Sequence, residues 1–104
     1  MDKKRVRLVV AYDGTAYHGW QVQPGVVTIE SELNKYLSEL LGEPISVIGA
    51  SRTDSGVHAM GNVAVFDTET TIPAEKIAVA LNQRLPEDIV ITKSEEVPLD
   101  FHPR

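Results

Sequence analysis

Hydrophobic residues alternate with other residues near the start of the chain. The positions that repeat on every second residue are Val6, Leu8, Val10 and Tyr12. This period of two, rich in β-branched side chains, predicts a strand with one face buried. The pattern stops at Asp13-Gly14, and the glycines and proline between there and Gly25 predict an irregular loop.

The next pattern has the spacing of an α-helix. Its apolar positions are Ile29, Leu33, Leu37, Leu40 and Leu41. Thr28 is placed to cap the start of this helix, where Glu30 and Glu32 suit the positive end of the helix dipole. Gly42 can adopt the left-handed conformation that ends a helix, and Pro44 prevents the helix from resuming. The pattern predicts a helix of about 13 residues.

Shorter patterns fill the second half of the chain. Apolar residues within 45–48 predict a second strand that leads into residues 51–54, and alternation over residues 62–68 predicts a third. These two strands are expected to be hairpin neighbours. Pro73 suits the first turn of a second helix, and residues 89–93 predict a fourth strand. The apolar stripe of the second helix is formed by Ile77, Leu81 and Leu85.

The predicted order of elements is β-α-β-β-α-β. This is the split arrangement of an α+β, ferredoxin-like domain, in which a four-stranded antiparallel sheet carries two helices on one face. The opposite face is left uncovered, and in an enzyme or a binding module it would be the working surface. A chain of 104 residues fits one such domain, so we expect residues 1–104 to form a single unit.

Composition is that of an ordinary globular protein, with 42% hydrophobic and 24% charged residues. No apolar run approaches the roughly 20 residues needed to span a bilayer. The sequence has no cysteine, which excludes disulfides, thiolate zinc sites and a thiol nucleophile. His18, His58 and His102 are too widely separated in sequence to predict a metal site. We therefore expect a cytoplasmic protein with no membrane association.

The charge of the chain is unevenly distributed. A formal charge of −5 argues against nucleic-acid binding, because clustered Lys and Arg are needed to neutralise phosphates. Basic residues nevertheless gather near the N-terminus: Lys3, Lys4, Arg5 and Arg7. This cluster is either a solvated terminus or an RNA-facing surface, and the sequence supports both interpretations equally.

The segment from Ala50 to Ala59 gathers ionisable and hydroxyl residues around a glycine at a predicted strand end. If Arg52 and Asp54 keep strand geometry, their side chains project from the same face of the sheet. The guanidinium would then favour the ionised carboxylate, which could act as a nucleophile or general base. The alternative is an architectural turn aspartate that bonds its own backbone, and the local pattern alone favours this alternative.

Three separated segments form a set when they are taken together. They are Tyr12-Asp13-Gly14-Thr15 continuing to Gly19-Trp20-Gln21-Val22-Gln23, the run Arg52-Thr53-Asp54-Ser55-Gly56-Val57-His58-Ala59, and Leu85-Pro86-Glu87-Asp88-Ile89. In this order they resemble the TruA family of tRNA pseudouridine synthases, and the resemblance covers essentially the whole chain. Three departures are Ser51 where the family often has glycine, Ser55 where it often has alanine, and Pro103 within the usual ending.

The resemblance implies an enzyme that converts uridines of the tRNA anticodon stem-loop to pseudouridine without a metal or an organic cofactor. Asp54 matches the family's essential aspartate and is expected to be the nucleophile. Arg52 matches the arginine associated with pairing to that aspartate and with extruding the target nucleotide. Thr53 and His58 belong to the same motif and are expected to contact the substrate. For His58, fixing the loop geometry is favoured over acid–base chemistry.

The first of the three segments supplies further candidates for substrate binding. Tyr12 and Trp20 could stack on bases, and Gln21 and Gln23 could hydrogen-bond RNA. An alternative with equal support is that Trp20 plugs the edge of the core, as amphipathic aromatic residues often do.

The resemblance also predicts how the chain fits into a larger protein. Family members continue into a second domain of similar fold, and this chain ends at Arg104, where that continuation should begin. We therefore expect an N-terminal domain without its C-terminal partner, which folds but does not modify tRNA alone. The expected partner is tRNA, and the full-length protein is expected to be a homodimer.

Two other functions fit the same predicted fold. A noncatalytic RNA-binding module would need aromatic residues on its central strands, and the third predicted strand offers only Phe66. A small regulatory or metabolite-binding domain would suit an acidic chain without cysteine. It would leave the cluster from Arg52 to His58 unexplained.

Overall fold

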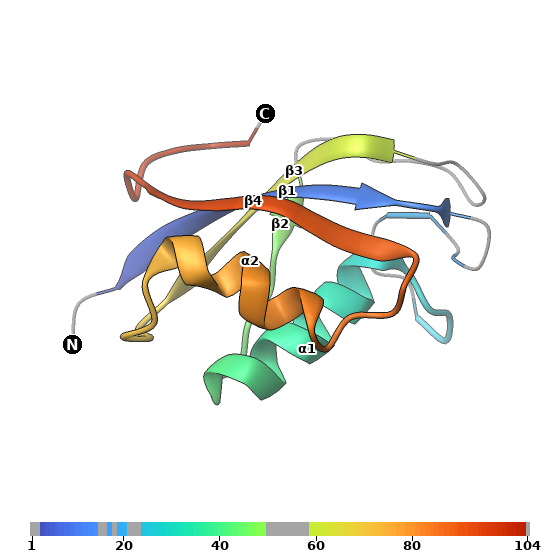
Figure 1. Ribbon diagram of the computed structural model, residues 1–104, viewed down its shortest axis with the longest axis horizontal. Coiled ribbons are helices and arrows are strands. Elements are labelled where there is room, and N and C mark those ends of the chain that lie inside the picture. Colours follow the sequence, from blue (N-terminus) through green and yellow to red (C-terminus); the bar gives the residue numbers. More distant parts are fainter. Residues whose placement is uncertain (1–2, 15–16, 18, 21–23, 50–58, 104) are drawn as a thin grey trace.

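Four strands and two helices make up the regular structure of the part of the chain that the computed structural model describes, residues 3–14, 17, 19–20, 24–49 and 59–103. They are β1 (Lys4–Tyr12), α1 (Ile29–Leu41), β2 (Ile48–Gly49), β3 (Ala59–Thr68), α2 (Ala74–Asn82) and β4 (Ile89–Val97). The strands form one antiparallel sheet in the order β2-β3-β1-β4. Both helices lie on the same side of it (Figure 1). The predicted α+β, ferredoxin-like arrangement is confirmed.

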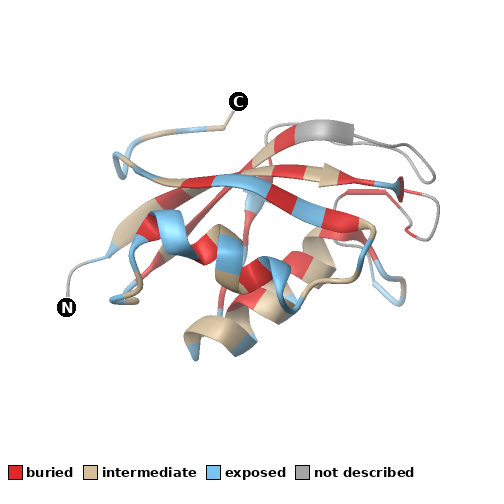
Figure 2. Ribbon diagram, viewed as in Figure 1, coloured by how far each residue is buried: buried red, intermediate tan, exposed pale blue. Residues whose placement is uncertain are grey.

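The hydrophobic core lies between the sheet and the two helices. Strand β1 is hydrogen-bonded to β3 on one side and to β4 on the other, so its inward side chains lie at the centre. The alternation predicted for this strand is confirmed, because Val6, Leu8 and Val10 are fully buried. Facing them from the helices are Ile29, Leu33, Leu37, Ile77 and Leu81, all 0% exposed. Figure 2 shows buried positions along the sheet strands and along both helices that lie beside them.

Helix α1 begins and ends where the sequence predicts. Thr28 is its N-cap, and the Thr28 hydroxyl accepts a hydrogen bond from the Ser31 backbone N–H. The Ser31 hydroxyl in turn accepts from the Thr28 N–H, which completes a reciprocal capping box. At the other end Gly42 has φ of 69°, the left-handed conformation that glycine adopts without strain.

Strand β2 begins later than predicted. Among the described residues, Ile48 and Gly49 are the ones that pair with β3, although a strand starting at Ile45 was expected. The physical reason is that side chains of α1 accept hydrogen bonds from the backbone N–H groups of residues just before Ile48. The Ile45 N–H donates to the Ser38 hydroxyl over 3.0 Å, and the Val47 N–H donates to Asn34 Oδ1 over 2.8 Å.

Helix α2 is also shorter than its apolar stripe suggests. Pro73 is its N-cap and Asn82 its last residue, so Leu85 packs from the turn that follows rather than from the helix. Strand β4 continues to Val97, four residues beyond the predicted 89–93. Among the described residues, no helix has the length and apolar character needed to cross a membrane.

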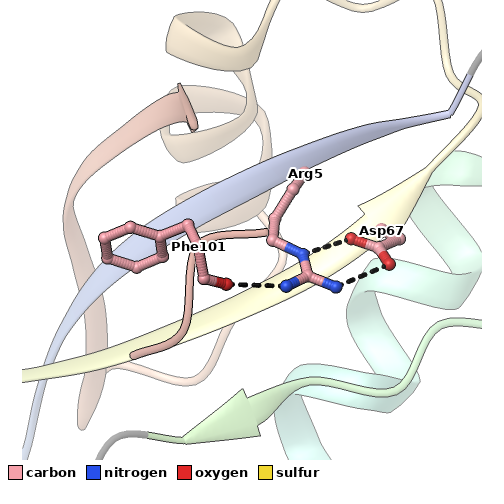
Figure 3. A network of polar contacts seen from close by, with 3 residues as sticks. All are labelled: Arg5, Asp67 and Phe101. Carbon is pink, nitrogen blue, oxygen red and sulfur yellow. Dashed lines mark hydrogen bonds and ion pairs between the residues drawn. The ribbon is translucent and has the colours of Figure 1, made fainter. Parts of the chain in front are cut away.

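The sheet face opposite the helices is partly covered by the segment that follows β4. Arg5 on β1 donates two hydrogen bonds to Asp67 on β3, over 2.7 Å and 3.0 Å. Its third nitrogen donates to the backbone carbonyl of Phe101 over 2.6 Å (Figure 3). The expectation that this face is left uncovered is therefore wrong over the two central strands, where Arg5 fastens the C-terminal segment.

Basic residues of the N-terminal cluster are paired within the domain. Besides the Arg5 contacts, Arg7 forms an ion pair of 2.7 Å with Glu95 on β4, and Lys4 Nζ donates to the Ile72 carbonyl over 2.7 Å. The hydrogen bond from Arg5 holds the pKa of the Asp67 carboxyl below its ordinary value, against the opposing effect of burial. Two of the four cluster residues, Arg5 and Arg7, are thus matched by carboxylates of neighbouring strands.

Candidate active site at the ends of strands β1 and β2

The predicted site residues divide into two groups. Tyr12 and Trp20 are described by the structure, at the end of β1 and in the loop that follows it. The other predicted residues lie outside the described part of the chain: Gln21, Gln23, Arg52, Thr53, Asp54 and His58. The surroundings of the Asp54 motif can nevertheless be built from the described residues that flank it.

Those flanking residues are Gly49, at the end of β2, and Ala59, at the start of β3. Gly49 pairs with Ala64, and Ala59 pairs with Tyr12 at the end of β1. Strands β1 and β2 are both antiparallel to β3, so they run in the same direction across the sheet. The segment that carries the motif is therefore joined to the sheet on both sides, beside the ends of β1 and β2.

Trp20 packs directly against Gly49. The indole is 1% exposed, and a β-carbon at position 49 would overlap its nitrogen and lie 2.7 Å from Cε2. Tyr12, 5% exposed, flanks the same indole with a ring-centroid distance of 5.6 Å. Of the two interpretations of Trp20, this burial favours packing over stacking on a base.

The loop that carries Trp20 is fastened to the start of α1. The Ile29 N–H donates to the Gly19 carbonyl over 3.2 Å, and the Glu30 N–H donates to the Trp20 carbonyl over 2.9 Å. The first backbone donors of a helix have no partner within the helix. Here the loop satisfies two of them, so the N-terminus of α1 positions Trp20.

A second anchor joins this loop to the start of β4. The Tyr17 hydroxyl donates to Asp88 Oδ1 over 2.6 Å, and the Asp13 N–H donates to the Asp88 carbonyl over 2.9 Å. Burial, together with the hydrogen bond to Asp88, raises the pKa of the Tyr17 phenol above its ordinary value. A phenol is already protonated at neutral pH, and this shift keeps Tyr17 a donor in more alkaline solution as well.

Sequence reasoning missed the contacts of Asp88, which appeared there only as a member of the third motif segment. The structure brings the three motif segments together through described residues. The Asp13 N–H in the first segment donates to the Asp88 carbonyl in the third, and Tyr12 in the first pairs with Ala59 in the second. The available signal was that all three segments belong to one family pattern, although a single sequence does not say which residues meet.

Metal ligation finds no support in the described part of the chain. Among those residues, no group of three His, Asp or Glu side chains lies close enough together to hold an ion.

The fold and these contacts define a ferredoxin-like α+β domain in which one described residue from each motif segment lies at the end of β1, where Tyr12 pairs with Ala59 and with Ile89. Comparison with known proteins gives its family. A family model described as tRNA pseudouridine synthase matches residues 8–104, and the chain belongs to that family.

Several relatives are similar over nearly the whole chain. It is 55% identical over 101 residues to tRNA pseudouridine synthase A of Clostridium acetobutylicum and 54% identical over 101 residues to that of Ruminiclostridium cellulolyticum. These alignments cover 97% of this chain and 41% of each relative. The corresponding protein of Rippkaea orientalis is 48% identical over 103 residues, covering 99% of this chain and 35% of its own length. The chain thus spans about two-fifths of the curated relatives that it matches.

Proposed function

We propose that this chain is the aspartate-bearing domain of an enzyme that isomerises uridine to pseudouridine in tRNA. One observation carries the proposal: the tRNA pseudouridine synthase model matches residues 8–104, a range that contains the whole motif from Arg52 to Ala59. The finer assignments, including the anticodon stem-loop as the target, follow from the family resemblance of the three motifs.

The reaction breaks the bond between uracil N1 and ribose C1′ and rejoins the base to C1′ through C5. The hydrogen on C5 is lost to solvent and N1 gains a proton, so atoms balance without an added reagent. Asp54 is the nucleophile that begins the exchange, because an ionised carboxylate can attack and later leave. Arg52 keeps that carboxylate ionised by its permanent positive charge.

A stacked uridine is out of reach of a carboxylate on a protein surface, so the target nucleotide is extruded from its stack. Arg52 assists this step through contacts to phosphate. Gln21 and Gln23 hydrogen-bond the RNA, and Thr53 and His58 contact the extruded nucleotide. Tyr12 is assigned to the substrate site as well, at the boundary between the core and the bound RNA.

The charge distribution supports a contribution to RNA binding from outside this domain. The net charge is −5, and both Arg5 and Arg7 are engaged with carboxylates. Phosphate binding needs clustered, available cations. We therefore propose that much of the basic cleft that binds RNA is formed by the part of the relatives' length that this chain does not cover. We also propose that the assembled enzyme is a cytoplasmic homodimer.

The test compares wild type with Asp54→Ala in the full-length product of the gene that encodes this chain. The substrate is tRNA that lacks modifications, and wild type should form pseudouridine in its anticodon stem-loop. The variant should form none. Its affinity for tRNA should stay within about threefold of the wild-type value, because the carboxylate acts in the transition state rather than in binding. The 104-residue chain alone should be inactive. Pseudouridine formation by Asp54→Ala would contradict the proposal.

The same measurement addresses the main rival, a noncatalytic RNA-binding module. That rival predicts that the wild-type protein binds tRNA without forming pseudouridine, and that Asp54→Ala loses affinity for tRNA. Under the metabolite-binding alternative, neither protein would bind tRNA.

A further inference from the structure

We infer that Asn82 closes the free edge of strand β4, and that without this side chain the edge pairs with the same edge of a second copy of this chain. The inference goes beyond the proposed function and does not depend on it, because strand pairing is separate from catalysis. The surface concerned is the backbone edge of residues 89–92.

Strand β4 lies at one end of the sheet. In the order β2-β3-β1-β4 its neighbour is β1, and none of the other described strands pairs with its second side. An edge strand presents N–H and C=O groups that can template pairing with another chain. With nine residues, β4 is longer than most strands. It therefore needs features that prevent such pairing.

The second half of β4 has two such features. The register with β1 shifts between Val9 and Val10, whose partners are Lys93 and Ile91, so Thr92 is an extra residue. A bulge of this kind bends and twists an edge away from a regular ladder. Three of the four residues at 93–96 are charged, and charged side chains on an edge disfavour pairing. This part of the strand is thus protected by its own sequence.

The first half is protected by helix α2 instead. Residues 89–92 are all β-branched and uncharged, a composition that favours strand pairing. Asn82, the last residue of α2, donates from Nδ2 to the Ile91 carbonyl over 2.9 Å, and its Oδ1 accepts from the Ile91 N–H over 2.8 Å. Two opposite residues of an antiparallel ladder exchange the same pair of hydrogen bonds. The Asn82 amide therefore takes the place of a residue in a neighbouring strand.

A second copy of β4 fits the edge that removal of Asn82 would open. Two identical antiparallel strands related by a two-fold axis form an isologous contact, the commonest type in homodimers. A register centred on Ile91 places residue 89 opposite 93 and residue 90 opposite 92, so no two charged residues face each other in this stretch. The same pairing would cover part of the Val90 side chain, which is exposed.

The test measures the weight-average mass of the 104-residue chain by sedimentation equilibrium, for wild type, Asn82→Ala and Ser94→Ala. Pairing of one short strand makes a small interface, so the protein is studied up to about 1 mM. The mass of Asn82→Ala should rise toward twice the wild-type value at the same concentration, whereas Ser94→Ala should keep the wild-type value. Ser94→Ala is the matched control, because it also removes two hydrogen bonds between β4 and α2, but on the buried side of the strand.

A further variant locates the association on β4. Asn82→Ala combined with Val90→Lys should have the wild-type mass, because pairing would have to desolvate a lysine on the edge strand. Equal masses of Asn82→Ala and wild type at every concentration would overturn the inference. Association of Ser94→Ala would contradict it as well, by tracing the effect to lost stability, and association of the combined variant would place the contact outside this edge.

Hydrogen exchange decides the question if Asn82→Ala does not fold. In the wild-type chain the Ile91 N–H is bonded to Asn82, so it should exchange at least about tenfold more slowly than the same amide in an unstructured peptide. Exchange at the peptide rate would show that the edge is open at Ile91, against the inference. These measurements involve no tRNA, so their failure leaves the proposed function standing.

Discussion

Replacing Ser94 with alanine removes a hydroxyl that joins strand β4 to helix α2. Ser94 is 6% exposed, and its Oγ donates to the Ala74 carbonyl over 2.6 Å. The same oxygen accepts from the Ala78 N–H over 3.0 Å. These two backbone groups are one helical turn apart, so the hydroxyl bridges the turn. Alanine fills the same space without either hydrogen bond.

The size of the effect follows from these two bonds. A typical intramolecular hydrogen bond contributes about 0.5–1.5 kcal/mol net, so removing two lowers the free energy of unfolding by about 1–3 kcal/mol. The i to i−4 spacing of Ala74 and Ala78 allows the helix to satisfy both groups itself, so we expect the lower part of that range, about 1–2 kcal/mol. For a domain of this size that corresponds to a decrease in Tm of about 4–16 °C.

The assay is thermal and urea unfolding of the 104-residue chain followed by circular dichroism. Ser46→Ala is the control, because Ser46 is exposed and such surface changes stay within about 0.5 kcal/mol. Ser94→Ala should lower the urea midpoint while Ser46→Ala leaves it unchanged. Equal stability of the two variants would show that the hydroxyl bridge does not stabilise the packing of α2 on β4.

Two further predictions concern the free energy of unfolding. The hydrogen bond from Arg5 lowers the pKa of Asp67, so the ionised carboxylate stabilises the folded state. This stabilisation is complete at pH values above the unfolded pKa, about 3.9, and is lost as the pH falls through the folded pKa. The stability difference between wild type and Asp67→Asn in urea titrations should therefore be constant from pH 5 to 7 and smaller at pH 3, and a difference that grows in acid would refute this. Thr28→Ala removes the side chain that caps α1 and should lower the free energy of unfolding by about 1 kcal/mol. Thr28→Ser keeps a hydroxyl at this position and should retain most of the wild-type value. An unchanged free energy of unfolding in Thr28→Ala would show that the cap is dispensable.

The order of elements could be predicted because it depends on local patterns. Alternation placed β1, and the spacing of leucines between Thr28 and Gly42 placed α1 together with both of its ends. The start of β2 could not be predicted in the same way. Its apolar residues look like a strand, but Asn34 and Ser38 take the backbone N–H groups of Val47 and Ile45, and no local pattern reports such distant partners.

The candidate site was only partly accessible from the sequence. The segment around Asp54 was identified by family resemblance, because residue types alone do not separate a catalytic aspartate from a turn aspartate. Trp20 had two interpretations of equal weight until its burial against Gly49 was known. The pairing of Tyr17 with Asp88 joins residues 71 positions apart, which periodicity cannot reveal.

The central claim is that Asp54 drives the exchange of the glycosidic bond, and one measurement tests it most directly. Because pseudouridine forms its new bond at C5, each turnover releases the hydrogen of that carbon. A tRNA transcript carrying tritium at uracil C5 should therefore release tritium to water when it is incubated with the full-length wild-type protein. Asp54→Asn should bind the same transcript and release none, while the exposed control Asp100→Asn should release tritium at the wild-type rate. Release at that rate by Asp54→Asn would contradict the assignment.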